Sequence, residues 1–127
     1  MIIDLLQTVF ERLNTDWRVY YNRAVGTVAD PIPDRYIIYK LPPYSSTVDR
    51  NDRILEVTFW TNGVQNPTII EQKVEEIDKR LRGYRHIDES HLLVFDKIGG
   101  GYIPDPDPIV ERRELRYLIK QSERIDS

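Results

Sequence analysis

The segment RILEVTFWT, residues 53–61, decides the fold that this sequence predicts. Side chains alternate along an extended strand, so Leu55, Val57 and Phe59 share one face. The other face mixes polar and apolar side chains: Ile54, Glu56, Thr58 and Trp60. The segment therefore predicts a strand with one face in a hydrophobic core and the other in contact with water or a partner.

The next segment predicts a helix over residues 67–82, which can cover the apolar face of that strand. Asn62-Gly63 is a turn dipeptide, Asn66 is a good N-cap, and Pro67 suits the first helical position. Apolar residues recur every three or four positions along it: Ile70, Val74, Ile77 and Leu81. Gly83 is expected to end the helix.

The same two periodicities predict the other elements, which are a helix over residues 2–14 and strands over 17–23, 36–41, 91–98 and 109–121. Polar or glycine- and proline-rich connections are expected at 44–52 and 99–108. In the last strand Leu115, Tyr117 and Ile119 should face inward. The order α-β-β-β-α-β-β predicts an α+β fold, a mostly antiparallel sheet of about five strands with two helices packed on one face. We expect the chain to form a single domain, 1–127, with a polar tail from about residue 122.

Composition narrows the possible functions. A chain of 127 residues suits one domain, and without cysteine it forms no disulfide framework, thiolate metal site or thiol nucleophile. The net charge of −3 disfavours a DNA-binding role, which usually requires a basic face. No apolar run approaches the length of a membrane span, and the N-terminus lacks the pattern of a signal peptide. We therefore expect that the protein neither recognises a nucleic-acid sequence nor binds a membrane.

Candidate catalytic and ligand-binding motifs are all incomplete. The glycine run at 99–101 lacks the Gly-Lys-Ser/Thr ending of a phosphate loop, and no helix follows it. His86 and His91 flank Asp88 and Glu89, a set that could hold zinc but is also common in a solvated loop. We expect the solvated loop.

Carboxylates give no stronger signal for catalysis. Asp105 and Asp107 alternate with prolines, which break the turn that a calcium loop requires, so they indicate a rigid acidic spacer. Glu56-Val57-Thr58 lacks the lysine of the Glu-x-Lys pattern found in metal-dependent nucleases. Paired carboxylates from distant strands remain open as an alternative. We expect no enzyme activity, cofactor or metal site.

Surface composition instead suggests protein contacts. The chain has eight tyrosines, a residue type that suits sheets and interfaces because it joins apolar area to a polar tip. Loop tyrosines, loop charges and the open faces of two strands supply the candidate interface residues: Tyr44, Asp49, Arg50, Trp60, Tyr102, Asp105, Asp107, Arg112 and Arg116.

A family resemblance rests on the order of elements together with short strings of sequence. These strings are Val19-Tyr20-Tyr21-Asn22-Arg23, Tyr36-Ile37-Ile38-Tyr39, Phe59-Trp60-Thr61 before a helix, and a late hairpin with Gly101-Tyr102 and Glu114-Leu115-Arg116-Tyr117. With these features, most of the chain resembles the tail terminator, or tail completion, proteins of long-tailed bacteriophages and prophages.

The resemblance implies a structural subunit with no catalysis. Such a subunit assembles with itself as a ring, expected to be a hexamer, on the end of the tail tube, and joins the tube protein to the head–tail connector. It would be found in the host bacterial cytoplasm during assembly and then in the virion tail. A head-completion or connector adaptor is the alternative within phage assembly, and a small metal-dependent nuclease is the alternative from another class.

Overall fold

The computed structural model describes residues 2–46, 51–61, 67–87, 91–103 and 111–123. Within these ranges it contains two helices and seven strands. In chain order the elements are α1 (Ile2–Leu13), β1 (Arg18–Tyr21), β2 (Arg35–Lys40), β3 (Pro43–Ser46), β4 (Asn51–Thr61), α2 (Pro67–Leu81), β5 (Arg85–Ile87), β6 (His91–Ile103) and β7 (Glu111–Glu123). The predicted α+β class is confirmed.

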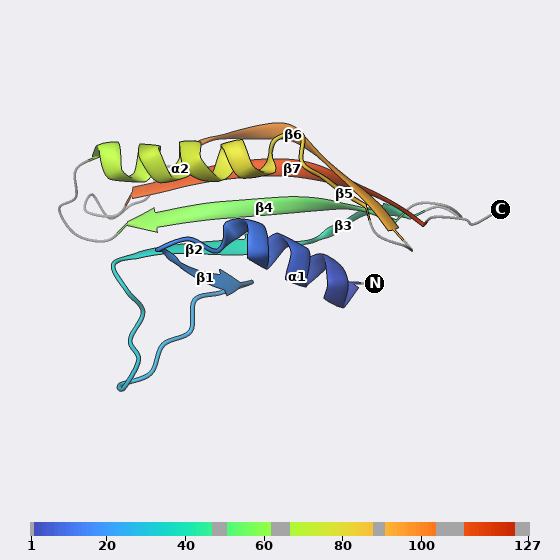
Figure 1. Cartoon of the computed structure of the whole chain (residues 1–127). Helices are drawn as coiled ribbons and strands as arrows, with labels where there is room; N and C mark the ends of the chain where they lie inside the picture. Colours follow the sequence, from blue (N-terminus) through green and yellow to red (C-terminus); the bar gives the residue numbers. More distant parts are fainter. Residues whose placement is uncertain (1, 47–50, 62–66, 88–90, 104–110, 124–127) are drawn as a thin grey trace.

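The sheet is mixed and curls into a half-barrel around the two helices (Figure 1). Six strands follow one another in the order β1-β2-β4-β7-β6-β5, and β3 pairs with β4 beside that path. The pairs are antiparallel except β1 and β2, which run parallel. A parallel pair needs a long connection, and residues 22–34 supply it without a helix.

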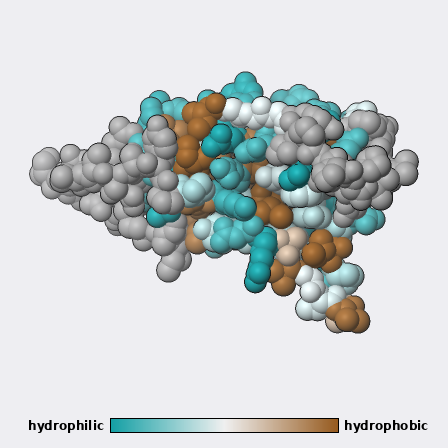
Figure 2. All heavy atoms as spheres, turned by 180° about the vertical axis from the view of Figure 1, so that it is seen from behind, coloured by the Kyte–Doolittle hydropathy of each residue, from teal (hydrophilic) through white to brown (hydrophobic). Residues whose placement is uncertain are grey.

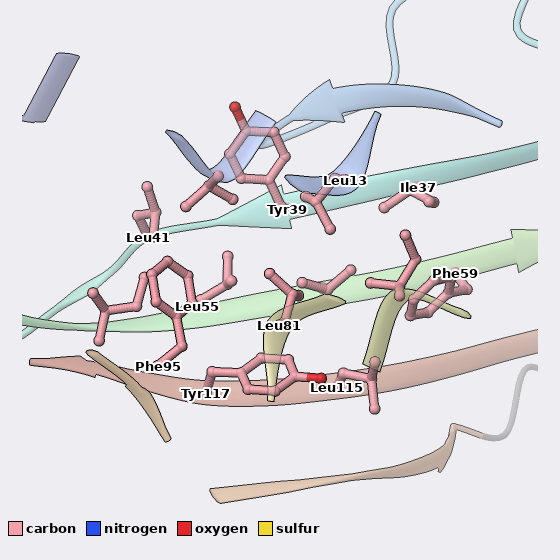
Figure 3. Packing of buried hydrophobic residues seen from close by; sticks show 14 of the residues in the cluster. Leu13, Ile37, Tyr39, Leu41, Leu55, Phe59, Leu81, Phe95, Leu115 and Tyr117 are labelled. Atoms are coloured by element: carbon pink, nitrogen blue, oxygen red, sulfur yellow. The ribbon is translucent and has the colours of Figure 1, made fainter. Parts of the chain in front are cut away.

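One hydrophobic core lies between the helices and the inner face of the sheet (Figure 3). The predicted inward faces of residues 53–61 and of the last strand are both correct. Helix α1 contributes a stripe with the expected 3–4 spacing, and α2 contributes three residues with full burial. Together the strands and helices bury Leu5, Val9, Leu13, Ile37, Leu55, Val57, Phe59, Ile70, Ile77, Leu81, Phe95, Tyr117 and Ile119 to 1% exposure or less.

Helix α2 is also fixed to the sheet by a polar contact inside the core. The Tyr117 hydroxyl donates to Asp78 Oδ1 at 2.5 Å, and Arg82 and Lys97 pair with the same carboxylate. Burial by itself would raise the pKa of Asp78, but these three donors outweigh it, so the pKa is lowered. Burial and the bond to Asp78 raise the pKa of Tyr117.

A second polar contact joins α2 to the connection after α1. Lys73 is 6% exposed and lies on the face where Val74 was expected to be buried, whereas Val74 is only half-buried. The ammonium of Lys73 lies 2.5 Å from Asp16 Oδ1 and 3.0 Å from Glu76 Oε2. The pKa of Asp16 is lowered, chiefly by the hydrogen bond from Lys73. The buried stripe of α2 therefore includes one neutralised cation.

Several predictions of strand number and loop position were wrong. The expected loop at 44–52 contains most of β3 and the start of β4. Asp52 is only 3% exposed, and its Oδ1 accepts a hydrogen bond from the backbone N–H of Gln121. The glycine run is not a connection, because β6 continues through it to Ile103 opposite β7. Strand β5 was missed, and the sheet has more strands than the expected five. These predictions failed because Asn, Ser and Gly have low β-propensity. Pairing with neighbouring strands overrides that propensity at 44–52 and in the glycine run.

Candidate protein interface

The face of the sheet opposite the helices is the candidate interface, and we call it the uncovered face. Its identity follows from alternation along β7, where Arg113 and Tyr117 reach α2 through Glu71 and Asp78. Their neighbours Arg112, Glu114 and Arg116 consequently lie on the other side. Figure 2 shows this face, on which hydrophilic side chains are mixed with apolar groups.

Four side chains form a row across four adjacent strands at one end of this face, and we call it the ladder. Register places Tyr36 of β2 opposite Trp60 of β4, and Trp60 opposite Arg112 of β7. Tyr20 of β1 extends the row by an edge-to-face contact with Tyr36, at 6.0 Å between ring centroids. The pairing of the strands therefore sets the order of the row, Tyr20-Tyr36-Trp60-Arg112.

The contacts within the ladder are close. The rings of Tyr36 and Trp60 are stacked, 5.9 Å apart with an interplanar angle of 10°. The Arg112 guanidinium carbon lies 4.4 Å from the centroid of the Trp60 ring, within the range of a cation–π contact. These contacts hold flat side chains in one orientation, so they lose little further conformational freedom when a partner binds.

Trp60 also carries an unsatisfied polar atom. Its Nε1 is buried and has no hydrogen-bond partner among the described residues. A buried donor without an acceptor costs free energy, and native structures usually supply the acceptor.

A charged group occupies the centre of the uncovered face. Arg116 lies 3.7 Å from Glu56 on β4 and 3.6 Å from Glu114 on its own strand. Lys120 lies 3.0 Å from Asp96 on β6. These side chains are between a quarter and a half exposed, so each pair contributes little to the stability of the monomer. Their alternating signs suit them to orient a partner with a complementary pattern.

Exposed apolar side chains lie beyond the charged group, toward the β5 edge. Ile87 of β5 is 62% exposed and Ile98 of β6 is 50% exposed. The uncovered face thus combines an aromatic end, a charged centre and an apolar edge. This composition is typical of protein interfaces, with aromatic residues and arginine enriched.

The predicted interface residues are therefore only partly brought together. Trp60, Arg112 and Arg116 all lie on the uncovered face, while Tyr20 and Tyr36 complete the ladder and were not predicted. Tyr44 lies in β3 and Tyr102 in β6, so neither lies in a loop as expected. Asp49, Arg50, Asp105 and Asp107 lie outside the described residues. Alternation along 18–21 and 36–39 was the signal that could have located the two missing tyrosines.

Chemical sites are not evident in the described part of the chain. No group of three or more His, Asp or Glu side chains within it is placed to hold a metal ion. His86 lies in β5 and not in the expected loop. The other residues considered as zinc ligands, Asp88 and Glu89 with the His91 side chain, fall outside what the structure describes. Among the described helices, none has the length and apolar character needed to cross a membrane.

Comparison with known proteins gives the fold alone. No family model matches the chain, and no curated protein matches it. Among solved structures, one similar chain has a TM-score of 0.69 at 12% identity, over 98% of this chain and 97% of that one. The match extends over nearly the whole of both chains, so the arrangement of elements is shared with that protein.

Proposed function

We propose that this protein is a structural subunit of a long-tailed phage or prophage that caps the tail tube as a ring. The uncovered face carries the proposal, because its ladder presents oriented aromatic rings and an arginine on the side of the sheet that neither helix covers. Aromatic residues and arginine dominate the binding energy of protein interfaces. The resemblance of the sequence to tail terminator proteins supplies the biological setting.

The mechanism of such a subunit is capping by complementary shape and charge. A ring requires a contact between two different surfaces of neighbouring copies, repeated until it closes. The same subunits must leave one surface for the tube protein and another for the connector. We assign the uncovered face, with Trp60 and Arg112 at one end and Arg116 at its centre, to the contacts that assembly makes.

The test adds purified protein to tail tubes of the phage that encodes it and images them by electron microscopy. An additional ring at one end of the tubes supports the proposal, and tubes that are never decorated contradict it. Incubation of the same preparation with plasmid DNA and Mg²⁺ or Mn²⁺ tests the nuclease alternative. Metal-dependent cleavage would overturn the assignment of a structural role.

A further inference from the structure

Strand β6 has an outer edge, on the side away from β7, that is only partly covered. Strand β5 pairs with this edge at Leu92–Val94. The cover extends one residue further, because the Phe95 N–H donates to the Tyr84 carbonyl at 2.9 Å and the Phe95 carbonyl accepts from the Gly83 N–H at 3.0 Å. Among the described strands, none pairs with the outer edge from residue 96 to residue 103. An open edge offers backbone donors and acceptors to which an extended chain can add.

Gly100 is the point at which another backbone can come closest to this open edge. The register places Gly100 opposite Leu115 of β7, and an irregularity between Lys97 and Gly99 shifts the alternation by one residue. Phe95 turns its N–H and C=O to the outer edge, so the shifted alternation gives Gly100 the same orientation. A glycine inside a strand often marks a close approach of a second backbone, because no side chain prevents it.

A groove with a volume of about 690 Å³ lies beside Gly100, and we call it the edge groove. It is lined by residues of α2, β6 and β7, and Val74 and Leu115 give it apolar walls. Gly100 faces the same side of the sheet as Leu115, since a Cβ on Gly100 would lie 3.2 Å from Leu115 Cδ2. The edge groove can therefore take an aliphatic side chain from a strand that pairs with β6.

The charged side chains at the edge groove leave an excess of positive charge. Glu71, Lys97 and Arg113 line it, two cations and one carboxylate. Glu114 also lines it, but its side chain lies on the uncovered face beside Arg116. Arg113 Nε lies 2.5 Å from Glu71 Oε1, so these two charges compensate each other. Lys97 remains as the cation that a ligand can use.

Lys97 already has a partner, but that partner does not depend on it. The Lys97 ammonium lies 3.3 Å from Asp78 Oδ2, and the Lys97 side chain is 31% exposed. Arg82 pairs with the same carboxylate, and the Tyr117 hydroxyl donates to it. Asp78 thus keeps two donors when Lys97 turns toward a ligand. A carboxylate brought to Lys97 is attracted without leaving Asp78 unpaired.

We propose that the edge groove binds a short extended segment of another protein, which adds as a strand to the outer edge of β6. An aliphatic side chain of this segment lies over Gly100 against Val74 and Leu115, and a carboxylate two residues away pairs with Lys97.

The spacing and the charge of this segment follow from the register. Lys97 and Gly100 lie opposite Tyr117 and Leu115, which are two positions apart on β7 and share one face. Side chains two residues apart on an added strand have the same separation. The excess positive charge favours an acidic segment over a neutral or basic one. The edge groove is separate from the uncovered face, so this inference does not depend on a role in tail assembly.

Nuclear magnetic resonance of the isolated, isotope-labelled protein tests the proposal with synthetic peptides. The probe is acetyl-Ser-Thr-Val-Thr-Asp-Thr-Ser-amide, and the control peptide has Lys in place of Asp. We expect the acidic peptide to shift the amide signals of Gly99, Gly100 and Gly101 with a Kd of about 1 mM or tighter, and the control to bind about threefold more weakly. Absence of these shifts at about 5 mM acidic peptide, or equal affinity for the two peptides, overturns the proposal.

A charge variant gives an independent measurement with the same peptides. Lys97→Met keeps the aliphatic stem and removes the charge, so the preference of about threefold for the acidic peptide should disappear. Lys79→Met removes an exposed charge on α2 outside the edge groove and should keep the preference. A preference that survives in Lys97→Met contradicts the assignment of Lys97.

The protein alone, followed over a range of concentrations, tests whether a second copy occupies the edge groove instead. The proposal predicts glycine signals that do not change with protein concentration. Shifts of these signals as the concentration rises would assign the edge groove to a contact between copies and overturn the proposal. If the peptide binds but tail tubes are never decorated, the proposed function fails while this inference stands.

Discussion

The indole ring of Trp60 is stacked on the ring of Tyr36 at 5.9 Å, on the side of the sheet that neither helix covers. The two residues are paired across β2 and β4, so the stack depends on strand register and not on a flexible loop. A shift of either strand by one residue would turn its ring toward the core and break the stack. The arrangement of the rings on this face is consequently linked to the packing that fixes the register.

The core should be sensitive to truncation of α2. Ile77 is fully buried, so Ile77→Ala is expected to lower the free energy of unfolding by about 2–5 kcal/mol. Val74→Ala, at a half-buried position of the same helix, should cost less. Urea denaturation of both variants measures the difference. An unchanged midpoint for Ile77→Ala would contradict the assignment of the buried face.

Asp78 should make stability depend on pH. Its pKa in the folded state is lowered because donors from Tyr117, Lys97 and Arg82 outweigh burial. A lowered pKa contributes stability above the unfolded value of about 3.9, and that contribution is lost as pH falls through the folded value. Asp78→Asn should cost about 1.5–3 kcal/mol at pH 7, with a smaller loss on acidification than the wild type.

The control for this prediction is Glu75→Gln, which alters an exposed ion pair on the same helix. It should change stability at pH 7 by less than about 1 kcal/mol. Denaturation curves between pH 7 and pH 3 give the comparison. Parallel pH profiles for Asp78→Asn and the wild type would show that Asp78 does not stabilise the fold through its charge.

Two neighbouring glycines should respond differently to alanine. Gly100 has a φ of +155°, and an added Cβ would lie 2.7 Å from the Glu114 carbonyl oxygen. Gly99 has open space at the same position. We expect Gly100→Ala to cost about 1–3 kcal/mol and Gly99→Ala less than about 1 kcal/mol. Thermal unfolding of the pair checks this, and equal melting temperatures would contradict the strand conformation of the glycine run.

The sequence was sufficient to predict the elements with strong periodicity. Residues 53–61 and 67–82 combine an apolar stripe with end signals, and both form the expected strand and helix. The glycine run was misread because glycine has low β-propensity, and its place in β6 is set by pairing with β7. The parallel pairing of β1 with β2 depends on contacts between distant residues, which local pattern does not encode.

The candidate interface was predictable in part, because the alternation of side chains along a strand can be read from the sequence. Alternation along 53–61 and 109–121 placed Trp60, Arg112 and Arg116 on one face, as the structure has them. That Trp60 lies beside Tyr36 and Tyr20 could not be predicted, because it depends on strand order and register. Lys73 was not expected in the core because its partner Asp16 is 57 residues away in the chain.

Lys73 provides a test of the buried cation. Lys73→Met keeps the buried apolar stem and removes the charge, so stability should stay within about 1 kcal/mol of the wild type or rise. Lys73→Ala also removes buried methylene groups and should be less stable than Lys73→Met by about 2 kcal/mol. Chemical denaturation of both variants and the wild type measures these differences in stability. A large loss in Lys73→Met would show that the ion pairs with Asp16 and Glu76 are required for the fold.

Capping of tail tubes by ladder variants tests the central claim most directly. The fraction of tube ends that carry a ring is counted by electron microscopy for the wild type and for two ladder variants, Trp60→Ala and Arg112→Glu. Glu75→Arg, a charge reversal on α2 away from the uncovered face, is the matched control. Circular dichroism first confirms that each variant is folded. We predict rings with the wild type and with Glu75→Arg, and few or none with the ladder variants. Capping by folded ladder variants at the wild-type frequency would contradict the assignment of this face to assembly.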